Sequence, residues 1–332
     1  MQVDISIIVP VFNRPQEVDE LLHSLLAQTC SDFELILVED GSAETCEMVT
    51  GSFNDRLNIR YYMKGNSGPG LSRNYGADKA SGNYFIFFDS DCLIPEHYIE
   101  IIKKELQDNF VDAYGGPDKA HPSFSSLQKA INYSMVSFFT TGGIRGSKIS
   151  LDKFYPRSFN MGISKAVFVM TGGFSEMRFG EDIDFSTRIL EAGYSTRLIP
   201  EAFVYHKRRS DFKKFFKQVF NSGIARINLY KRHPGSLKPV HVFPSVFTTG
   251  SSALIILSIF LNIIFIAPVV LYALILFSDS FIKNKNIKVA FLSVIAGFIQ
   301  ITGYGLGFIK ASWKRLVLRH DEFHVYKNNF YK

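Results

Sequence analysis

The sequence predicts an α/β protein with a mainly parallel central sheet, followed by helices that cross a membrane. Three observations lead to this prediction. In the first half, short runs of β-branched and aromatic residues alternate with segments whose apolar residues recur at helical spacing. Several of these runs end in carboxylates. In the last third, residues 242–278 and 289–309 contain no Asp, Glu, Lys or Arg, and each stretch exceeds the roughly 20 residues that cross a bilayer.

Four strands are predicted in the first half. The first, over residues 5–11, is a β-branched run, and an apolar stripe over residues 16–27 predicts the helix that follows, with Pro15 near its first turn. Because a strand, a helix and a strand in succession pair in parallel through a right-handed crossover, the next strand is expected beside the first. The remaining three strands are predicted over residues 33–38, 59–62 and 85–88.

The most informative of these strands ends at a pair of carboxylates. Residues 85–88 are all large and apolar, which is typical of a strand buried on both faces, and Asp89 and Asp91 follow at its carboxyl end. Ligands of open α/β sheets bind at that edge. Two carboxylates this close in sequence repel each other unless a cation lies between them, and Mg²⁺ and Mn²⁺ prefer such oxygen ligands. A solvated turn is the alternative, because Asp and Ser are common turn formers.

Other polar groups are predicted at the same edge. Asn13 follows the first strand, and Asp40 follows the second. Residues 65–70, Gly-Asn-Ser-Gly-Pro-Gly, form a loop that leads into a helix predicted over residues 71–80, and the free backbone N–H groups of such a junction favour phosphates. Arg73, in the first turn of that helix, either contacts a diphosphate or makes a surface ion pair.

The order and spacing of these motifs resemble those of family 2 glycosyltransferases, and the resemblance runs from about Ile5 to His206. It is carried by Ile-Ile-Val-Pro-Val-Phe-Asn-Arg at 7–14, Val-Glu-Asp-Gly-Ser at 38–42, Ser-Arg-Asn-Tyr-Gly-Ala at 72–77 and Phe-Asp-Ser-Asp at 88–91. The resemblance implies the GT-A fold and a nucleotide-diphosphate donor, for which a UDP-sugar is expected. It also implies a divalent metal cofactor, Mg²⁺ or Mn²⁺.

Carried over residue by residue, the resemblance implies a set of donor contacts. The turn of the first strand and the acid Asp40 would hold the nucleobase, Arg73 would approach the diphosphate, and Asp89 would contact the ribose or the metal. Asp91 would bind the metal. The expected donor-binding residues are Pro10, Phe12, Asn13, Asp40, Arg73 and Asp89.

A second pair of acids, Glu181 and Asp182, stands at the start of a predicted helix. The helix dipole favours carboxylates there, so simple capping is the alternative interpretation, above all for Glu181. The pair resembles the acceptor-site motif of the family, which implies that Asp182 is the general base and Glu181 a catalytic neighbour. A sugar hydroxyl needs such a base, and one direct displacement would invert the anomeric carbon.

His206 ends a strand near residues 200–206 and, by the resemblance, would lie near the diphosphate and the metal. A polar end to a strand is the alternative, since His is common on surfaces. The Gln-x-x-Arg-Trp motif of processive synthases is absent, which favours a non-processive enzyme. Residues 115–150 are less informative. Candidates there are His121, Tyr133, Phe138 and Phe139 for the acceptor path, and Gly142, Gly143 and Gly146 for a loop.

Positive charge is concentrated before the first apolar stretch. The formal net charge is +6, and ten Lys or Arg accompany one acid, Asp211, between residues 206 and 240. In this position such a segment indicates anionic cytoplasmic lipid rather than nucleic acid. With two membrane spans the basic tail 310–332 returns to the cytoplasm, whereas three would place it outside against the positive-inside rule, so two are preferred over three. Asn262 and Pro268 are candidates for a kink or a turn.

The first part of the chain is expected in the cytoplasm, within a multi-pass protein of the inner (plasma) membrane. The N-terminus lacks the basic n-region of a signal peptide. Cys30, Cys46 and Cys92 are an odd number without metal-ligand spacing, which fits apolar fillers in a reducing compartment. Four parts follow from these patterns: a catalytic domain at 1–206, a basic juxtamembrane segment at 207–241, a transmembrane region at 242–309 and a basic tail at 310–332.

The function expected from these patterns is that of a metal-dependent inverting glycosyltransferase, hexosyltransferase-like and of class EC 2.4, for cell-surface polysaccharide or glycolipid assembly. Its position beside the bilayer predicts a lipid-linked saccharide acceptor and membrane lipids as partners, with no nucleic acid. Two alternatives stay open. The intact set of Asp40, Asp91 and Asp182 argues against a catalytically idle sugar-nucleotide sensor or scaffold, and a nucleotidyltransferase would not need Asp182 as a base.

Overall fold

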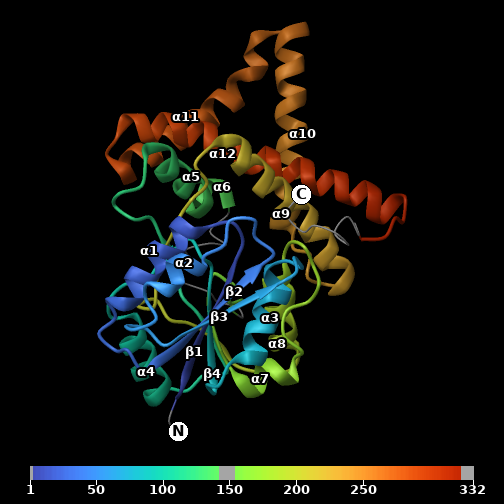
Figure 1. The fold of residues 1–332 in the computed structure, drawn as a ribbon. Coiled ribbons are helices and arrows are strands. Elements are labelled where there is room, and N and C mark those ends of the chain that lie inside the picture. The colour runs from blue at the N-terminus through green and yellow to red at the C-terminus, as the bar shows by residue number, and fades with distance from the viewer. Residues whose placement is uncertain (1–2, 142–153, 323–332) are drawn as a thin grey trace. The chain divides into compact units, whose positions relative to one another are not determined.

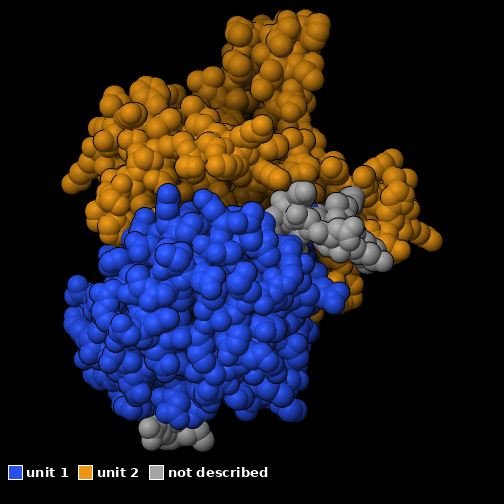
Figure 2. Space-filling view, viewed as in Figure 1, with its two compact units in different colours: residues 1–119, 150–206, 323–332 blue, residues 120–149, 207–322 orange. Residues whose placement is uncertain are grey.

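A computed structural model describes residues 3–141 and 154–322 of the chain. These residues form two compact units, which Figure 2 colours separately. The described part of unit 1 comprises residues 3–119 and 154–206, and that of unit 2 comprises residues 120–141 and 207–322. One boundary between the two units lies after His206. Residues 120–141, however, which the sequence assigned to the first domain, belong to unit 2.

Unit 1 is built on a sheet whose strand order is β3-β2-β1-β4-β8-β6-β9 within the described residues. The first four strands in chain order are parallel: β1 (Ile5–Val11), β2 (Phe33–Asp40), β3 (Ile59–Lys64) and β4 (Tyr84–Phe88). β8 (Asn160–Ser164) runs antiparallel to both β4 and β6 (Ala113–Gly115), and β9 (Thr196–Leu198) is parallel to β6. The mainly parallel sheet predicted from the sequence is therefore confirmed.

Helices cover both faces of this sheet (Figure 1). On one face, α1 (Pro15–Leu26), α2 (Glu47–Gly51) and α4 (Tyr98–Asp108) enclose the larger hydrophobic core. On the other, α3 (Pro69–Lys79), α7 (Lys165–Met170) and α8 (Glu181–Glu191) enclose a second core. The predicted helices over residues 16–27 and 71–80 correspond to α1 and α3. Each begins at a proline, whose fixed φ and missing N–H suit the first turn of a helix.

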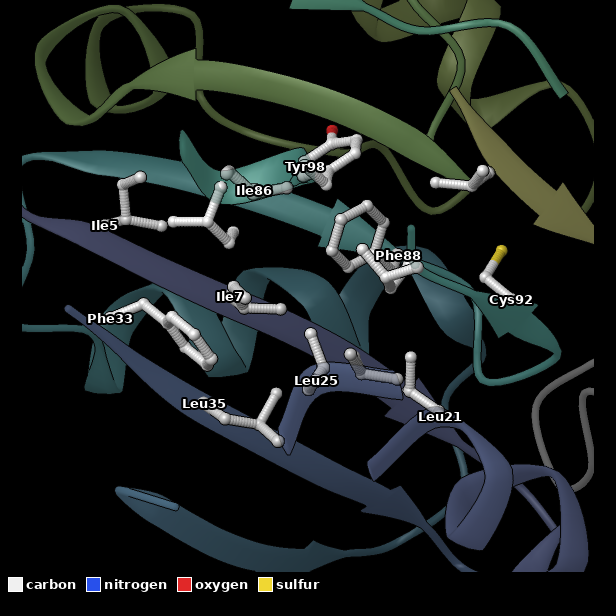
Figure 3. Packing of buried hydrophobic residues seen from close by; sticks show 14 of the residues in the cluster. Ile5, Ile7, Leu21, Leu25, Phe33, Leu35, Ile86, Phe88, Cys92 and Tyr98 are labelled. Carbon is white, nitrogen blue, oxygen red and sulfur yellow. The ribbon is translucent and has the colours of Figure 1, made fainter. Parts of the chain in front are cut away.

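The wholly apolar sequence of β4 follows from burial on both faces. Successive side chains of a strand point to opposite faces, so Ile86 and Phe88 enter the first core while Phe85 and Phe87 enter the second. Figure 3 shows Ile86 and Phe88 in the core that also contains Leu21 of α1. This packing fixes the position at which the chain leaves β4 and reaches Asp89.

A second, smaller sheet brings a distant segment back to the end of β4. It joins β5 (Cys92–Leu93), β10 (Val204–His206) and β7 (Asp118–Lys119), with β10 in the middle. β10 is antiparallel to β5 and parallel to β7, and its register places His206 opposite Cys92. His206, at the end of β10, therefore lies beside β5, which follows Asp91 directly in the chain.

Unit 2 is helical throughout its described elements. These are α5 (Ser126–Val136), α6 (Phe138–Thr141), α9 (Phe212–Arg232), α10 (Pro239–Phe260), η1 (Ile263–Ile266), α11 (Ala267–Asn284), α12 (Ile287–Ser312) and a π-helical turn, η2 (Trp313–Val317). α9 and α12 pack closely at glycines. A Cβ on Gly307, for example, would lie 2.0 Å from the carbonyl oxygen of Phe220. Small residues allow this close approach between the helices.

Three segments of unit 2 are long and apolar enough to cross a membrane: Pro239–Phe260, Ile263–Asn284 and Ile287–Val317. The sequence left two or three spans open and preferred two. A third membrane-length segment arises because the uncharged run 242–278 is divided between two helical segments and does not form one helix. α10 ends before Leu261, and the Asn262 side chain caps a new helical segment by accepting a hydrogen bond from the Ile264 N–H at 2.9 Å.

Candidate active site

The candidate site lies at the edge of the sheet where β1, β2 and β4 end. These strands are adjacent and parallel, with Val11 paired to Glu39 and Ile8 paired to Phe87. Asn13 therefore follows β1, Asp40 ends β2 and Asp89 follows β4 at one edge of the sheet, as the sequence predicts. Ion pairs connect the side chains around Asp89, and they join residues that are far apart in the sequence.

Asp91 and His206 are in direct contact. The Nε2 of His206 lies 3.1 Å from Oδ1 of Asp91 and 3.8 Å from Oδ2 of Asp89. The strand pairing of β10 with β5 creates this contact, and the imidazole is stacked on Phe159 with 5.0 Å between ring centroids. Burial alone would raise the pKa of Asp91, but the charges and hydrogen bonds of His206 and Arg14 outweigh it and hold that pKa well below its ordinary value. Asp91 is therefore ionised at neutral pH.

Arg73 links the two predicted pairs of acids. Its guanidinium, on the buried side of α3, lies 2.5 Å from Oδ1 of Asp89 and 3.5 Å from Oε1 of Glu181. It also lies over the ring of Phe174, 5.3 Å from the centroid. The surface ion pair that the sequence left open for Arg73 is excluded, because its side chain is only 3% exposed.

Glu181 and Asp182 occupy the first turn of α8. Gly180 precedes them in a left-handed conformation with φ +85°, which a glycine adopts without strain. Oδ2 of Asp182 accepts a hydrogen bond from Nε of Arg157 at 2.6 Å, and its Oδ1 accepts one from the N–H of Ile183 at 2.8 Å. Asp182 thus accepts a hydrogen bond from a backbone N–H at the start of the helix, which agrees in part with the capping alternative. It is also held by an arginine.

These two neighbouring acids have opposite electrostatic environments. For Glu181, burial followed by the negative charge of Asp182 raises the pKa to about 7. For Asp182, burial acts in the same direction, but the charge and hydrogen bond of Arg157 outweigh it and lower the pKa. The lowered pKa favours the ionised form of Asp182, which can accept a proton, whereas the raised pKa favours the protonated form of Glu181.

Replacing Glu181 by glutamine is expected to remove a pH dependence of stability. The folded protein raises the pKa of this carboxyl from 4.5 to about 7, so between these values the folded state binds more protons than the unfolded state, and the stability of the wild type falls as the pH rises. Relative to the wild type, Glu181→Gln should gain ~1–3 kcal/mol between pH 5 and pH 8. Thermal unfolding at both pH values measures this gain, and a stability difference that is the same at both would contradict it.

Asp40 and Asn13 lie at the same edge but use their side chains within the protein. Asp40 is fully buried, and its carboxylate accepts hydrogen bonds from Nζ of Lys64 at 2.6 Å and from the N–H groups of Ser67 and Gly68 at 2.9 and 2.8 Å. Oδ1 of Asn13 accepts hydrogen bonds from two N–H groups of the turn after β2. These contacts order the glycine-rich loop and the turn. A role of either residue at a nucleobase stays a prediction.

The remaining predicted positions are placed as follows. Pro10 is buried within β1, and Phe12 is half-buried in the turn after it. The acceptor-path candidates His121, Tyr133, Phe138 and Phe139 belong to unit 2, where the hydroxyl of Tyr133 donates a hydrogen bond to Asp279 at 2.6 Å. Gly142, Gly143 and Gly146 lie outside the described residues, as does the tail beyond residue 322.

Sequence reasoning assigned no role to two residues of this site, Arg14 and Arg157. Arg14, the last residue of the first-strand motif, lies 2.5 Å from Oδ2 of Asp91, and Arg157 lies against Asp182. Cys92 contributes a sulfur to a group in which donor atoms of Asp91, Cys92 and His206 all lie within 4.8 Å of one another. The place of Arg14 within a recognised motif was the available signal. For Arg157 no local signal exists, because its partner is 25 residues away.

The donor atoms around Asp91 fit a divalent cation. Carboxylate oxygens of Asp91 and Asp89 together with Nε2 of His206 provide ligands of the kinds that Mn²⁺ accepts. Cys92 is fully buried in the hydrophobic core, and burial raises the pKa of its thiol well above the ordinary value, so it stays protonated and is a poor ligand for a hard cation. Asp91 and His206 are therefore the residues that would hold an ion, and Asp89 lies close to His206 but outside this compact group of donor atoms.

Comparison with solved structures defines the class of fold. The structure of the mannosyltransferase PcManGT from Pyrobaculum calidifontis in complex with GDP-Man and Mn²⁺ aligns with this chain at a TM-score of 0.67 and 15% identity, covering 95% of this chain and 88% of that one. The protein therefore has the GT-A fold, here an α/β fold with a mostly parallel sheet.

Sequence comparisons define the family. Residues 6–168 match the model of glycosyl transferase family 2. An uncharacterised glycosyltransferase of Haemophilus influenzae is 31% identical over 215 residues, which cover 62% of this chain and 70% of that protein. The chain belongs to glycosyl transferase family 2. An uncharacterised glycosyltransferase of Rickettsia felis is 38% identical over 143 residues, or 42% of this chain, and the chain spans only 23% of that longer relative.

Proposed function

We propose that this chain is a metal-dependent inverting glycosyltransferase that transfers a sugar from a nucleotide-diphosphate donor to a hydroxyl group of an acceptor. One observation carries the proposal: Arg73 joins a carboxylate pair suited to a cation, Asp89 and Asp91, to the acid pair Glu181 and Asp182. Family membership supports the activity. The complex of the Pyrobaculum mannosyltransferase with GDP-Man and Mn²⁺ supports both the donor class and the cofactor.

In the proposed reaction, Asp182 accepts the proton of the acceptor hydroxyl as the new C–O bond forms. Its lowered pKa keeps it ionised, and the hydrogen bond from Arg157 fixes the orientation of its carboxylate. Arg73 and Arg14 provide positive charge for the diphosphate, and Asp91, Asp89 and His206 would hold the divalent ion. When bound, that ion supplies charge neutralisation at the leaving diphosphate. A single displacement on the face opposite the leaving group inverts the anomeric carbon.

For the donor, we propose a UDP-sugar whose base is held by the edge that β1 and β2 form. Pro10, Phe12 and Asn13 define one side of this edge, and Asp40 orders the glycine-rich loop beside it. Direct contact of the Asp40 carboxylate with the base would require one of its present hydrogen bonds to be exchanged. The loop and the first turn of α3 also supply backbone N–H groups near Arg73.

For the acceptor, we propose a lipid-linked saccharide at the cytoplasmic surface of the plasma membrane, with transfer of one or few sugars. Three apolar helical segments in unit 2 and the basic segment at 207–241 support attachment to an anionic lipid surface. The absence of the processive-synthase motif supports the limited number of additions. The pathway would be the assembly of cell-surface polysaccharide or glycolipid.

Donor binding tests the proposal directly. The full chain in detergent should be thermally stabilised by one nucleotide sugar in the presence of Mn²⁺, because a ligand that binds only the folded state raises its apparent stability by ~2.7 kcal/mol at 100 times its Kd. Excess EDTA should abolish both the stabilisation and the transfer of radiolabelled sugar to membrane lipid extracts. Transfer that continues unchanged in excess EDTA would rule out the metal-dependent mechanism.

A further inference from the structure

Each carboxylate oxygen of Asp91 lies within ion-pair distance of a nitrogen atom. Nη1 of Arg14 lies 2.5 Å from Oδ2, and Nε2 of His206 lies 3.1 Å from Oδ1. The Asp91 side chain is only 11% exposed, so its charge is poorly compensated by water. The guanidinium thus supplies at this carboxylate the positive charge that a divalent ion would otherwise provide.

Of the two partners, Arg14 is the one positioned to leave. His206 is held in β10 between two neighbouring strands, and its ring is stacked on Phe159. Arg14 lies in the turn between β1 and α1, and its side chain is 30% exposed against 18% for that of His206. A long side chain that reaches the site from a turn can rotate towards solvent without disrupting a strand.

We propose that Arg14 is a displaceable counterion of Asp91 that makes metal binding depend on donor binding. This inference rests on the proposed function of the site. A cation that binds Asp91 must displace Arg14 or share its carboxylate, which weakens binding of the metal alone. A nucleoside diphosphate offers the displaced guanidinium a new anionic partner and thereby removes that penalty. Metal and nucleotide then strengthen each other's binding, and the coupling is reciprocal.

The experiment is a titration of Mn²⁺ into the metal-free full chain in detergent, by isothermal calorimetry and by electron paramagnetic resonance of free Mn²⁺, with and without UDP or GDP. In the wild type, the nucleotide that binds should tighten Mn²⁺ binding by about tenfold, within the usual range of coupling between two sites. Arg14→Gln should bind Mn²⁺ alone about tenfold more tightly than the wild type does, and the effect of the nucleotide should shrink.

Two further variants keep the result interpretable. Arg14→Lys retains the positive charge and should keep the weak, nucleotide-dependent binding of the wild type. Arg60→Gln is the matched control, because Arg60 pairs with Glu34 at 2.8 Å with side-chain exposures of 35% and 11%, close to those of Arg14 and Asp91. Glu34 pairs with Ser6 near the beginning of β1 and β2, at the opposite edge of the sheet, so Arg60→Gln should leave Mn²⁺ binding unchanged.

The outcomes separate this inference from the proposed function. Mn²⁺ binding to Arg14→Gln that is equal to or weaker than wild-type binding overturns the inference alone, as does wild-type binding that is independent of the nucleotide. An equal tightening in Arg14→Lys also overturns it, because charge would then not be the cause. If the wild type binds no Mn²⁺ under either condition, the proposed metal site and this inference both fail.

Discussion

Replacement of Asp182 by asparagine is expected to reduce sugar transfer by ~10²–10⁴-fold while donor binding is retained, because loss of a positioned general base has an effect of this size. The side chain keeps its shape but can no longer accept the proton of the acceptor hydroxyl. Single-turnover transfer assays measure the first effect, and Mn²⁺-dependent thermal stabilisation by the donor measures the second. The variant leaves Arg157 without its carboxylate, so its thermal midpoint must be recorded alongside.

Asp184→Asn is the matched control for this variant. Asp184 stands in the same first turn of α8 and is also paired with an arginine, Arg188, at 3.0 Å. Asp184→Asn should also lower the stability of the protein, because Arg188 loses its carboxylate partner. Its sugar transfer, however, should not fall as that of Asp182→Asn does. Unchanged turnover in Asp182→Asn would exclude Asp182 as the base and would revive the alternative of a nucleotidyltransferase. A sensor or scaffold would show donor binding but no transfer in the wild type itself.

Replacement of Asp91 by asparagine is expected to abolish metal-dependent donor binding and to reduce transfer by at least ~10³-fold. This factor corresponds to about 4 kcal/mol, because several kcal/mol of charge stabilisation at the leaving group depend on the ion that Asp91 would hold. Calorimetric titration with Mn²⁺ and the transfer assay measure the two effects. Increasing the Mn²⁺ concentration should not restore wild-type turnover.

Asp112→Asn serves as the control for Asp91→Asn. Asp112 precedes β6 and accepts a hydrogen bond from the N–H of Ser195 at 2.8 Å, so it is a carboxylate that also holds part of the backbone in place. Its replacement should leave Mn²⁺ binding intact. If Asp91→Asn binds Mn²⁺ as tightly as the wild type, the metal site must be assigned to other residues.

The parts of the fold that were predictable from the sequence are those that depend on local patterns. β1, β2 and β4 are apolar runs because both of their faces are buried, and α1 begins at a proline because the first turn of a helix tolerates one. The antiparallel direction of β8 has no local signal, since it depends on pairing with strands about 50 and 75 residues earlier in the chain.

The same distinction applies to the candidate site. Carboxylates at strand ends were visible as motifs, but their pairing with arginines was not, because Arg14 and Asp91, for example, are 77 residues apart. The different environments of Glu181 and Asp182 also depend on one distant residue, Arg157. In unit 2, the long uncharged run was obvious, whereas its interruption at Leu261 and Asn262 depends on backbone geometry that hydropathy does not report.

The pairing of acids with arginines has a consequence for how quickly a donor reaches the site. Asp91, Asp89 and Asp182 each lie against an arginine, and the raised pKa of the fourth acid, Glu181, favours its neutral form. The cluster therefore carries little net charge and produces little long-range attraction for an anionic donor. Association should be limited by ordinary diffusion and orientation, and ionic strength should change its rate less than in clefts lined by charges of one sign.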